Sequence, residues 1–380
     1  MRGTTAIVGV AESDLGQAQP GTTPTDLMAQ ATHRALHDAG LSLGDVDALF
    51  ASSTQLPMAT LNLGEYLGIS PRYTDSTQIG GSSFVAHLNH AQAAITAGLA
   101  DVALVAYGST QRSQGRSNAA PQEVSPYEAP YHPVLPVSAY ALAASRHMYE
   151  FGTTREQLAE VAVAARAWAA LNPVAWDHGP LTIDDVLDAP TISSPLGVRD
   201  CCLVTDGGGA VVLTSAERAR DLARPPVYIL GVGEAHTHRH ISSMPSLTVT
   251  AAVQSGAAAY EAARLGPSDI DVVELYDAFT ITPILFLEDL GFCAKGEGGA
   301  FVEGGRVAPG GEFPLDTNGG GLSYCHPGMY GLLLVVEAVR QLRGECGDRQ
   351  VANCDVALAH GNGGVLSSQC TAILGTAATV

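Results

Sequence analysis

A histidine near the end of the chain has the setting of a catalytic group. His326 stands in the run Asn-Gly-Gly-Gly-Leu-Ser-Tyr-Cys-His-Pro-Gly at positions 318–328. The glycines before it and the Pro-Gly after it favour tight turns, which hold an imidazole in place. A positioned imidazole can transfer protons near neutral pH or donate a hydrogen bond to a developing oxyanion. Tyr324 lies two residues earlier, so an extended backbone between them would bring both polar tips to one substrate carbon.

A second polar group stands earlier in the chain, in Glu-Leu-Tyr-Asp-Ala-Phe at positions 274–279. Tyr276 can donate or accept a hydrogen bond, and it can move protons where neighbouring donors lower its pKa. Its alternative role is that of an aromatic that packs at a strand end. We expect Asp277 to be structural, with its carboxylate accepting from nearby backbone N–H groups.

Together these motifs resemble the thiolase superfamily, in its branch of lipid-transfer-protein and sterol-carrier-type thiolases. The resemblance gives His326 the place of the histidine that helps bind the thioester oxygen, although Cys325 replaces the glycine of the usual Gly-His-Pro. Tyr276 takes the place of an asparagine that positions a water. The resemblance therefore implies an enzyme that acts on acyl-coenzyme A thioesters.

Both thiolase cysteines are missing. The nucleophile's place reads Gln-Ile-Gly-Gly-Ser-Ser-Phe at 78–84, with Gly80 where the sulfur should be. The place of the proton-moving cysteine reads Ala-His-Gly-Asn-Gly-Gly at 359–364, with Gly361 aligned to the sulfur. We expect the substrate to be bordered by Gly80, Gly81, Ser82, Gly361 and Gly363.

The two tyrosine motifs resemble those of steroid side-chain aldolases, a cysteine-free group within the same branch. Those enzymes have Tyr-X-His-Gly and Tyr-Asp-X-Phe, and Pro327 is the departure here. The resemblance implies retro-aldol cleavage of a β-hydroxyacyl-CoA into a ketone or aldehyde and a shorter acyl-CoA. Tyr324 or Tyr276 would take the β-hydroxyl proton, and His326 would hold the enolate. Coenzyme A enters as part of the substrate, and no tightly bound cofactor is expected.

Two other functions stay open. One is a thiolytic or condensing acyltransferase that carries the acyl group on Cys325 or Ser82. Neighbouring residues on an extended chain point to opposite sides, which argues against Cys325. The other is a catalytically silent subunit that binds lipid or acyl-CoA. A Schiff-base mechanism has one candidate, because Lys295 is the only lysine in the chain.

Two further histidine positions have alternative interpretations. His360 could replace the missing proton-moving cysteine, but a buried histidine with satisfied nitrogens explains it equally well. His236, His238 and His240 stand at alternate positions. On a strand this spacing would place the three imidazoles on one face, where they could bind a metal ion. They follow a strand and open a loop, so we interpret them as a solvated or ligand-lining loop and predict no metal.

Repeated patterns show which elements must position these groups. Residues 35–50 read as a helix, a glycine cap and a strand opened by Asp-X-Asp, and residues 262–273 repeat this order. A second echo pairs the strands 101–105 and 355–359, each after a long helix near 81–98 or 328–343. This predicts a duplicated β-α-β unit in an α/β fold. The resemblance implies a thiolase fold with a layered αβαβα core, halves at 1–225 and 226–380, and a loop-domain insertion at about 110–195.

Composition narrows the class of partner and the location. A net charge of −19 argues against nucleic acid or an anionic membrane as the main partner. The chain opens without a charged-then-apolar leader and has no apolar run of about 18 residues, so we expect a cytoplasmic protein. The seven cysteines fit no zinc or disulfide spacing. The resemblance further implies a homodimeric core and a partner protein with a zinc-ribbon/OB fold.

Overall fold

One nine-stranded mixed sheet runs through the molecule. The computed structural model describes residues 1–114 and 124–380. The strand order is β3-β2-β4-β7-β1-β8-β11-β10-β9. The strands are β1 (Thr5–Glu12), β2 (Ala48–Ala51), β3 (Tyr73–Asp75), β4 (Val102–Ser109), β7 (Gly207–Ser215), β8 (Val227–His236), β9 (Val272–Leu275), β10 (Val356–Gly363) and β11 (Ser368–Gly375). Nearly all of their residues are buried, as continuous apolar strands covered on both faces should be.

The sheet consists of two copies of one pattern. From its centre outward, β1-β7-β4-β2 on one side matches β8-β11-β10-β9 on the other. In both copies the first three strands are antiparallel and the fourth pairs in parallel with the third. The copies join where β1 pairs with β8 at Ala6–Tyr228 and Ile7–Val227. The duplicated core that the sequence predicts is therefore confirmed.

The Asp-X-Asp echo has a shared structural cause. Asp47 accepts hydrogen bonds from the backbone N–H groups of Asp101 and Val102, at the start of the neighbouring parallel strand. Asp271 does the same for the N–H groups at 355 and 356. The helix ends differ: the first ends at Gly40 in the left-handed conformation, whereas the second ends at Arg264 rather than at the glycine we expected.

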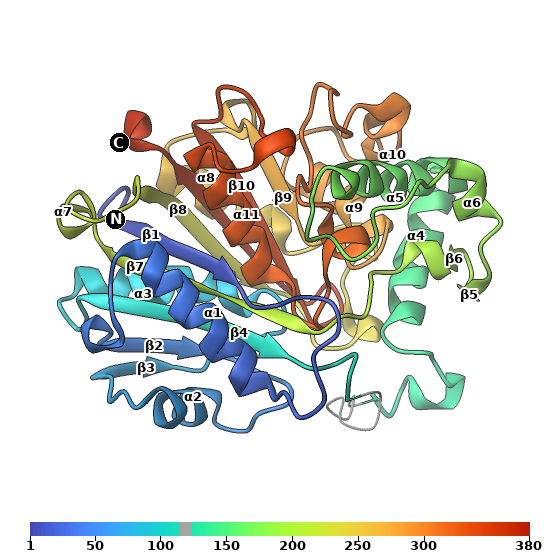
Figure 1. Cartoon of the computed structure of the whole chain (residues 1–380). Helices are drawn as coiled ribbons and strands as arrows, with labels where there is room; N and C mark the ends of the chain where they lie inside the picture. Colours follow the sequence, from blue (N-terminus) through green and yellow to red (C-terminus); the bar gives the residue numbers. More distant parts are fainter. Residues whose placement is uncertain (115–123) are drawn as a thin grey trace.

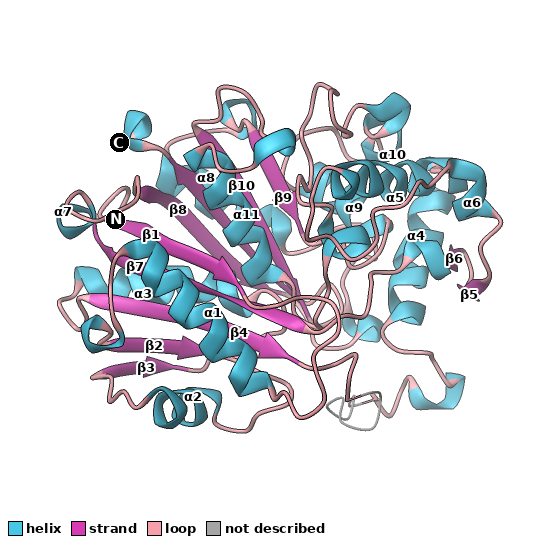
Figure 2. Ribbon diagram, in the orientation of Figure 1, coloured by secondary structure: helices cyan, strands magenta, loops and turns pink. Residues whose placement is uncertain are grey.

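Helices cover both faces of the sheet (Figures 1 and 2). Two buried helices, α3 (Ser83–Thr96) and α11 (Gly331–Arg343), contact each other and strands of both halves. They correspond to the long helices expected near 81–98 and 328–343. The helix α1 (Pro24–Ala39) packs on β1, β7 and β4, and α8 (Ala252–Ala263) packs on β8 and β11. The short helices α2 (Ala59–Leu67) and α7 (Ala216–Ala219) lie near the ends of strands.

The expected insertion carries helices of its own. They are α4 (Val137–Phe151), α5 (Arg155–Ala170) and α6 (Ile183–Leu187), followed by the small hairpin β5 (Thr191–Ser193) and β6 (Leu196–Gly197). Part of the insertion, 115–123, lies outside the described residues. Figure 1 shows these helices at one end of the sheet, beside α9 (Ile281–Asp289) and α10 (Gly298–Phe301) of the second half. In the part of the chain that the structure describes, no helix has the length and apolarity to cross a membrane.

The only lysine of the chain lies beside a contact between the insertion and the second half. Lys295 Nζ lies 3.0 Å from Glu288 Oε2 and 2.6 Å from Asp289 Oδ1, and it donates to the carbonyl of Thr248 at 2.7 Å. Glu288 also contacts His147 of α4 at 3.0 Å. Both carboxylates have fully buried side chains. The ammonium group is therefore a structural counter-ion, and its three acceptors leave it unsuited to Schiff-base chemistry.

Replacing Lys295 with methionine is expected to destabilise the protein by about 3 kcal/mol, because it leaves two buried carboxylates without their cation. Denaturant unfolding measures this loss. Arg34→Met provides the control, since Arg34 pairs with Asp14 at 2.7 Å on the surface and should matter by less than about 1 kcal/mol. Equal losses in the two variants would contradict the role of Lys295.

Candidate active site

Tyr276 and His326 form a hydrogen-bonded pair at the centre of the candidate site. Tyr276 follows β9, and His326 follows a π-helical turn at Gly320–Tyr324. The Tyr276 Oη and His326 Nε2 atoms lie 3.1 Å apart, and both residues are buried. The backbone N–H of Tyr330 donates to the same Tyr276 oxygen at 3.0 Å. Since Oη accepts that bond, its own proton is free to be donated to a neutral imidazole.

The backbone around His326 is held by β4 and by the segment that precedes β7. His326 N–H donates to Thr205 Oγ1 at 3.0 Å, and Thr205 N–H donates to the His326 carbonyl at 3.2 Å. Tyr107 of β4 donates its hydroxyl proton to the carbonyl of Pro327 and accepts from the N–H of Met329 at 3.1 Å. These hydrogen bonds hold the backbone on both sides of His326 and thereby limit the positions that its imidazole can take.

Asp277 links the segment of Tyr276 to the segment of His326. Its Oδ1 accepts from Gly321 N–H at 2.5 Å and its Oδ2 from Leu322 N–H at 3.1 Å, both in the π-helical turn before His326. This is the structural role expected for it. Burial raises the pKa of Asp277 to about 7. The backbone of Tyr276 is fixed separately, by its N–H on the His360 carbonyl and its carbonyl on the Thr282 hydroxyl.

Burial keeps both members of the pair uncharged at neutral pH. It lowers the pKa of His326 to about 4, because the imidazolium form loses its hydration. It also raises the pKa of Tyr276 well above its usual value, with the Tyr330 N–H opposing part of that rise. A neutral phenol that donates to a neutral imidazole can relay one proton without a separated charge in the resting state. The arrangement fits general acid/base chemistry.

The structure gives Tyr324 a different partner. Its hydroxyl donates to Glu12 Oε1 at 2.8 Å, and Glu12 is paired with Arg340 of α11. Burial and the Glu12 carboxylate raise the pKa of Tyr324 well above its usual value. Tyr324 ends the π-helical turn, and this ion pair fixes its hydroxyl. Of the two tyrosines that the sequence offers as the base, Tyr276 is the one hydrogen-bonded to His326.

The two candidate acyl carriers have partners that are not bases. Cys325 Sγ lies 3.1 Å from Thr205 Oγ1, and burial raises the pKa of its thiol to about 12. Ser82 donates its hydroxyl proton to the Ile79 carbonyl at 2.9 Å and lies 2.7 Å from Ser368 Oγ. Nucleophilic catalysis needs an activated thiolate or alkoxide. Neither environment provides that activation.

His360 is a structural histidine. Its Nδ1 lies 2.9 Å from Thr371 Oγ1 and its Nε2 lies 2.9 Å from Gln369 Oε1. Burial lowers its pKa to about 4, and the ring packs edge-on against Phe286. Both nitrogens are thus satisfied, and only its backbone carbonyl supports Tyr276. The interpretation as a replacement base is not supported by this geometry.

The alternating histidines have separate partners. His236 Nε2 contacts Glu234 at 2.9 Å, while His238 Nε2 contacts the carbonyl of Val365 at 2.8 Å. His236 ends β8, and His240 follows in the loop. Within residues 1–114 and 124–380, no group of three or more His, Cys, Asp or Glu side chains has an arrangement that could hold a metal ion.

The glycines that we expected to border the substrate pack closely against neighbouring backbone or against the ring of Tyr276. A Cβ added to Gly81 would lie 2.1 Å from Cε2 of Tyr276, whereas one added to Gly80 would meet the backbone of Gly363 and Gly364 at 2.6–2.7 Å. A Cβ on Gly361 would lie 3.0 Å from the Cα of Ser82. The side-chain position that faces the Tyr276–His326 pair is thus that of Gly81, not that of Gly80.

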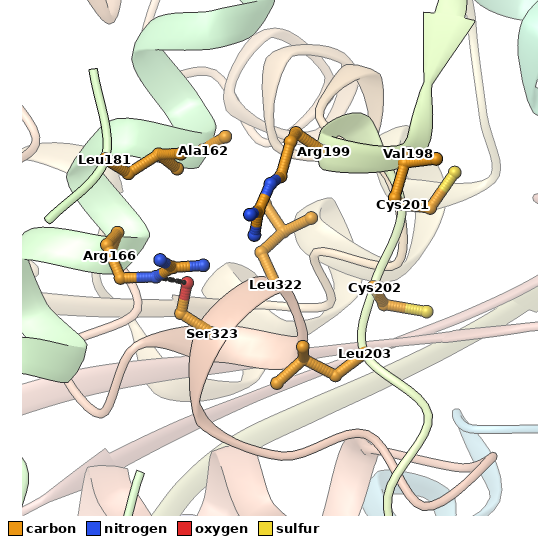
Figure 3. Close-up of a pocket in the computed structure, with 10 residues that line it drawn as sticks. All are labelled: Ala162, Arg166, Leu181, Val198, Arg199, Cys201, Cys202, Leu203, Leu322 and Ser323. Carbon is orange, nitrogen blue, oxygen red and sulfur yellow. Dashed lines mark hydrogen bonds between the residues drawn. The ribbon is translucent and has the colours of Figure 1, made fainter. Parts of the chain in front are cut away.

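A pocket of about 220 Å³ opens beside these segments (Figure 3). Its lining includes Arg166, Arg199, Cys202 and Leu322. Arg166 is fixed by Asp177 at 2.6 Å and donates to Ser323 Oγ at 2.9 Å. The head of Arg199 is half-exposed and lies 3.4 Å from Asp177.

Two residues that line the pocket are hydrogen-bonded to the segment that follows Tyr276. Cys202 N–H donates to the carbonyl of Ala278 at 2.9 Å, two residues beyond Tyr276. Leu322 binds Asp277 through its N–H. The pocket volume suits part of a slender ligand rather than a whole drug-sized molecule.

Three residues of the site escaped the sequence analysis. They are Tyr330, which donates to Tyr276, and Tyr107 and Thr205, which hold the His326 segment. Tyr330 precedes the first residue of α11 and could have been found as the start of the long helix after His-Pro-Gly. Tyr107 and Thr205 lie far from His326 in the chain, and their types carry no separate signal.

Comparisons with known proteins agree with this architecture. The family described as "Thiolase C-terminal domain-like" matches residues 233–376. The chain is 32% identical to an acetyl-CoA acetyltransferase of Methanothermobacter thermautotrophicus, over 94% of this chain and 96% of that protein. The chain belongs to the thiolase superfamily. Within this superfamily it is also 33% identical to a steroid side-chain-cleaving aldolase of Thermomonospora curvata, over 90% and 91% of the two chains.

A solved structure extends this likeness to the whole fold. The structure described as "Ltp2-ChsH2(DUF35) aldolase" matches with a TM-score of 0.90 and 31% identity, over 99% of this chain and 98% of that chain. The thiolase superfamily relatives thus include an acetyltransferase and aldolases at nearly equal identity. Overall similarity does not distinguish acyl transfer from aldol cleavage, so the two reactions must be distinguished by the residues of the site.

Proposed function

We propose that the protein is an acyl-CoA-dependent carbon–carbon lyase that cleaves a β-hydroxyacyl-CoA into a ketone or aldehyde and a shorter acyl-CoA. One observation carries the proposal: Tyr276 fills the space of a side chain at position 81 and hydrogen-bonds a neutral His326. The phenol of the proton relay therefore occupies the space that a side chain at position 81 would need. The similarity to the two aldolases supports the same reaction.

The relay accounts for every proton of a retro-aldol cleavage. The β-hydroxyl proton passes to Tyr276 Oη as Oη gives its own proton to His326 Nε2. The Cα–Cβ bond breaks, the β-carbon becomes a carbonyl, and the electron pair moves into the acyl-CoA enolate. The imidazolium offsets the enolate charge, and the relay then runs in reverse to protonate Cα. No covalent intermediate and no added oxidant or reductant is required.

The pocket provides a place for the thioester arm. It runs along Cys202 and Leu322, whose backbones contact Ala278 and Asp277 next to the proton relay. The half-exposed Arg199 at the pocket can attract a phosphate group. We therefore propose that coenzyme A reaches the site as part of the substrate through this pocket, with no separate tightly bound cofactor.

We further propose that the chain works as a homodimer with a partner protein of the zinc-ribbon/OB class. The partner protein is supported by the similarity to a structure whose description names two components, Ltp2 and ChsH2(DUF35), and the homodimer rests on the family resemblance alone. A cytoplasmic location is also part of the proposal. It is supported by the seven free cysteines, which suit a reducing compartment.

The acyltransferase alternative is favoured by one finding, the similarity to an acetyl-CoA acetyltransferase. It requires a carrier such as Cys325. Replacing Cys325 with alanine is expected to leave kcat within about threefold of the unaltered protein, since the thiol hydrogen-bonds Thr205 and the carbonyl of Asp206, neither of which can activate it. Steady-state assays of cleavage and of acyl transfer measure this. Loss of acyl transfer in the variant would instead establish Cys325 as the carrier.

Turnover without free coenzyme A tests the proposed reaction. Purified protein, alone and with its OB-fold partner, is mixed with a panel of β-hydroxyacyl-CoA esters, and the products are identified by mass spectrometry. We expect a carbonyl compound and a shorter acyl-CoA in equal amounts. Strict dependence on added coenzyme A would point to thiolysis. Binding without turnover across the panel would favour the silent subunit.

A further inference from the structure

The backbone before α3 approaches the ring of Tyr276 very closely in the candidate site. Gly81 is buried just before α3, and its missing side chain would point at Tyr276. An added Cβ would lie 2.1 Å from Cε2 and 2.7 Å from Cζ of that ring. Non-bonded carbon atoms prefer a separation of about 3.5–4.0 Å. The ring of Tyr276 therefore occupies the volume that any side chain at position 81 would need.

The backbone around Gly81 has no room to retreat. The same added Cβ would lie 2.7 Å from the carbonyl oxygen of Asn362. On its other side, a Cβ on Gly331 would lie 2.0 Å from the carbonyl of Gly81, and a Cβ on Gly363 would lie 1.7 Å from the carbonyl of Ile79. Three glycine contacts thus pack the turn before α3 directly against β10 and the start of α11. A displacement of Gly81 would have to move these backbones as well.

Tyr276 cannot turn away without losing its function. Its hydroxyl is tied to His326 Nε2 at 3.1 Å and to Tyr330 N–H at 3.0 Å. Its ring meets the rings of His326 and Tyr330 edge-on, with centroids 5.6 and 5.8 Å apart. A push from position 81 would act on the ring edge and break the geometry of the proton relay.

We propose that Gly81 is the positioning residue for Tyr276, and that the two residues form one functional pair that excludes any side chain at position 81. A glycine at position 81 lets the phenol reach both His326 and the start of α11. Any side chain there, including a thiol, displaces the phenol. The chemical meaning of the pair rests on the proposed lyase function, whereas the packing claim does not.

A thermal double-mutant cycle tests the packing claim without any assay of activity. The variants are Gly81→Ala, Tyr276→Asn and their combination. We expect Gly81→Ala to lower Tm, and its effect to fall to about half or less in the Tyr276→Asn background, since the clash with the ring is gone. Gly256→Ala serves as the control. Gly256 lies on α8, and its added Cβ would lie 2.7 Å from Leu290 Cδ2, away from Tyr276. The Tm loss of this variant should therefore be equal in both backgrounds.

Equal Tm losses for Gly81→Ala in both backgrounds would overturn the pairing. If Gly81→Ala alone is insoluble, recovery of soluble protein in the double variant supports the pairing, and continued insolubility overturns it. In the cleavage assay, folded Gly81→Ala should lose about 100-fold in kcat with KM nearly unchanged, as expected for a displaced acid/base group. If the unaltered protein cleaves no β-hydroxyacyl-CoA, the lyase proposal fails while the thermal cycle still decides the packing claim.

Discussion

Replacing Tyr276 with phenylalanine is expected to lower kcat for cleavage about 100- to 1,000-fold. The phenol oxygen is the only atom removed, and it is the atom that lies 3.1 Å from His326 Nε2. Loss of a positioned general acid/base group has about this effect. The ring still packs against Gly81 and Tyr330, so substrate binding should persist. Steady-state kinetics, with acyl-CoA affinity measured by calorimetry, separate the two effects.

Tyr324→Phe is the matched control, because it removes a hydroxyl from the other candidate base. That hydroxyl donates to Glu12 at 2.8 Å. Its loss should cost about 1 kcal/mol of stability and change kcat far less than Tyr276→Phe does. The opposite ranking, with Tyr324→Phe inactive and Tyr276→Phe active, would transfer the role of base to Tyr324.

Replacing His326 with glutamine should lower kcat about 100-fold or more. The amide can still hydrogen-bond Tyr276, but it cannot take up a proton or supply a positive charge beside the enolate. His360→Gln provides the comparison, since His360 is also buried but its imidazole contacts Thr371 and Gln369 and not Tyr276. We expect that variant to lose stability and to keep kcat in its folded fraction. Equal activity losses in both variants would contradict the assignment of His326.

The pH profile should report the same imidazole. Burial lowers the pKa of His326 to about 4, so the group is neutral and able to accept a proton at any higher pH. The relay is therefore lost as pH falls through about 4, and His326 should cause no change in kcat/KM between about pH 5 and 8. In that range the neighbouring Asp277, with its pKa of about 7, is the group that titrates. The profile is measured with short incubations, so that acid unfolding stays separate. A decline centred near pH 6.5 that persists in Asp277→Asn would contradict the burial of His326.

The duplicated fold could be predicted from the sequence, because each repeated sequence pattern reflects the same hydrogen bonds in both halves. Asp47 and Asp271 occupy equivalent positions before strands and bind equivalent N–H groups in the neighbouring strand. Such a repeated need leaves a repeated pattern. The helix end at Arg264 departs from the pattern, because a non-glycine residue adopts the left-handed conformation there.

The sequence predicted only part of the candidate site. The motifs located Tyr276 and His326, since turn-forming residues surround His326 and a strand precedes Tyr276. They did not show which tyrosine faces His326, because Tyr324 is held by Glu12, a residue 312 positions away in the chain. The sequence assigns the missing sulfur to Gly80, whereas the missing Cβ that faces Tyr276 is that of Gly81, and this direction depends on how the turn before α3 packs against β10.

One measurement tests the central claim, that a proton relay replaces the covalent intermediate. The protein is mixed in deuterium oxide with a β-hydroxyacyl-CoA that it turns over, and the protein and the shorter acyl-CoA are both weighed by mass spectrometry. The relay predicts unmodified protein and a single deuterium at Cα of the acyl-CoA, because the hydroxyl proton exchanges with solvent and returns there. An acyl adduct that maps to Cys325 or Ser82 would contradict the account.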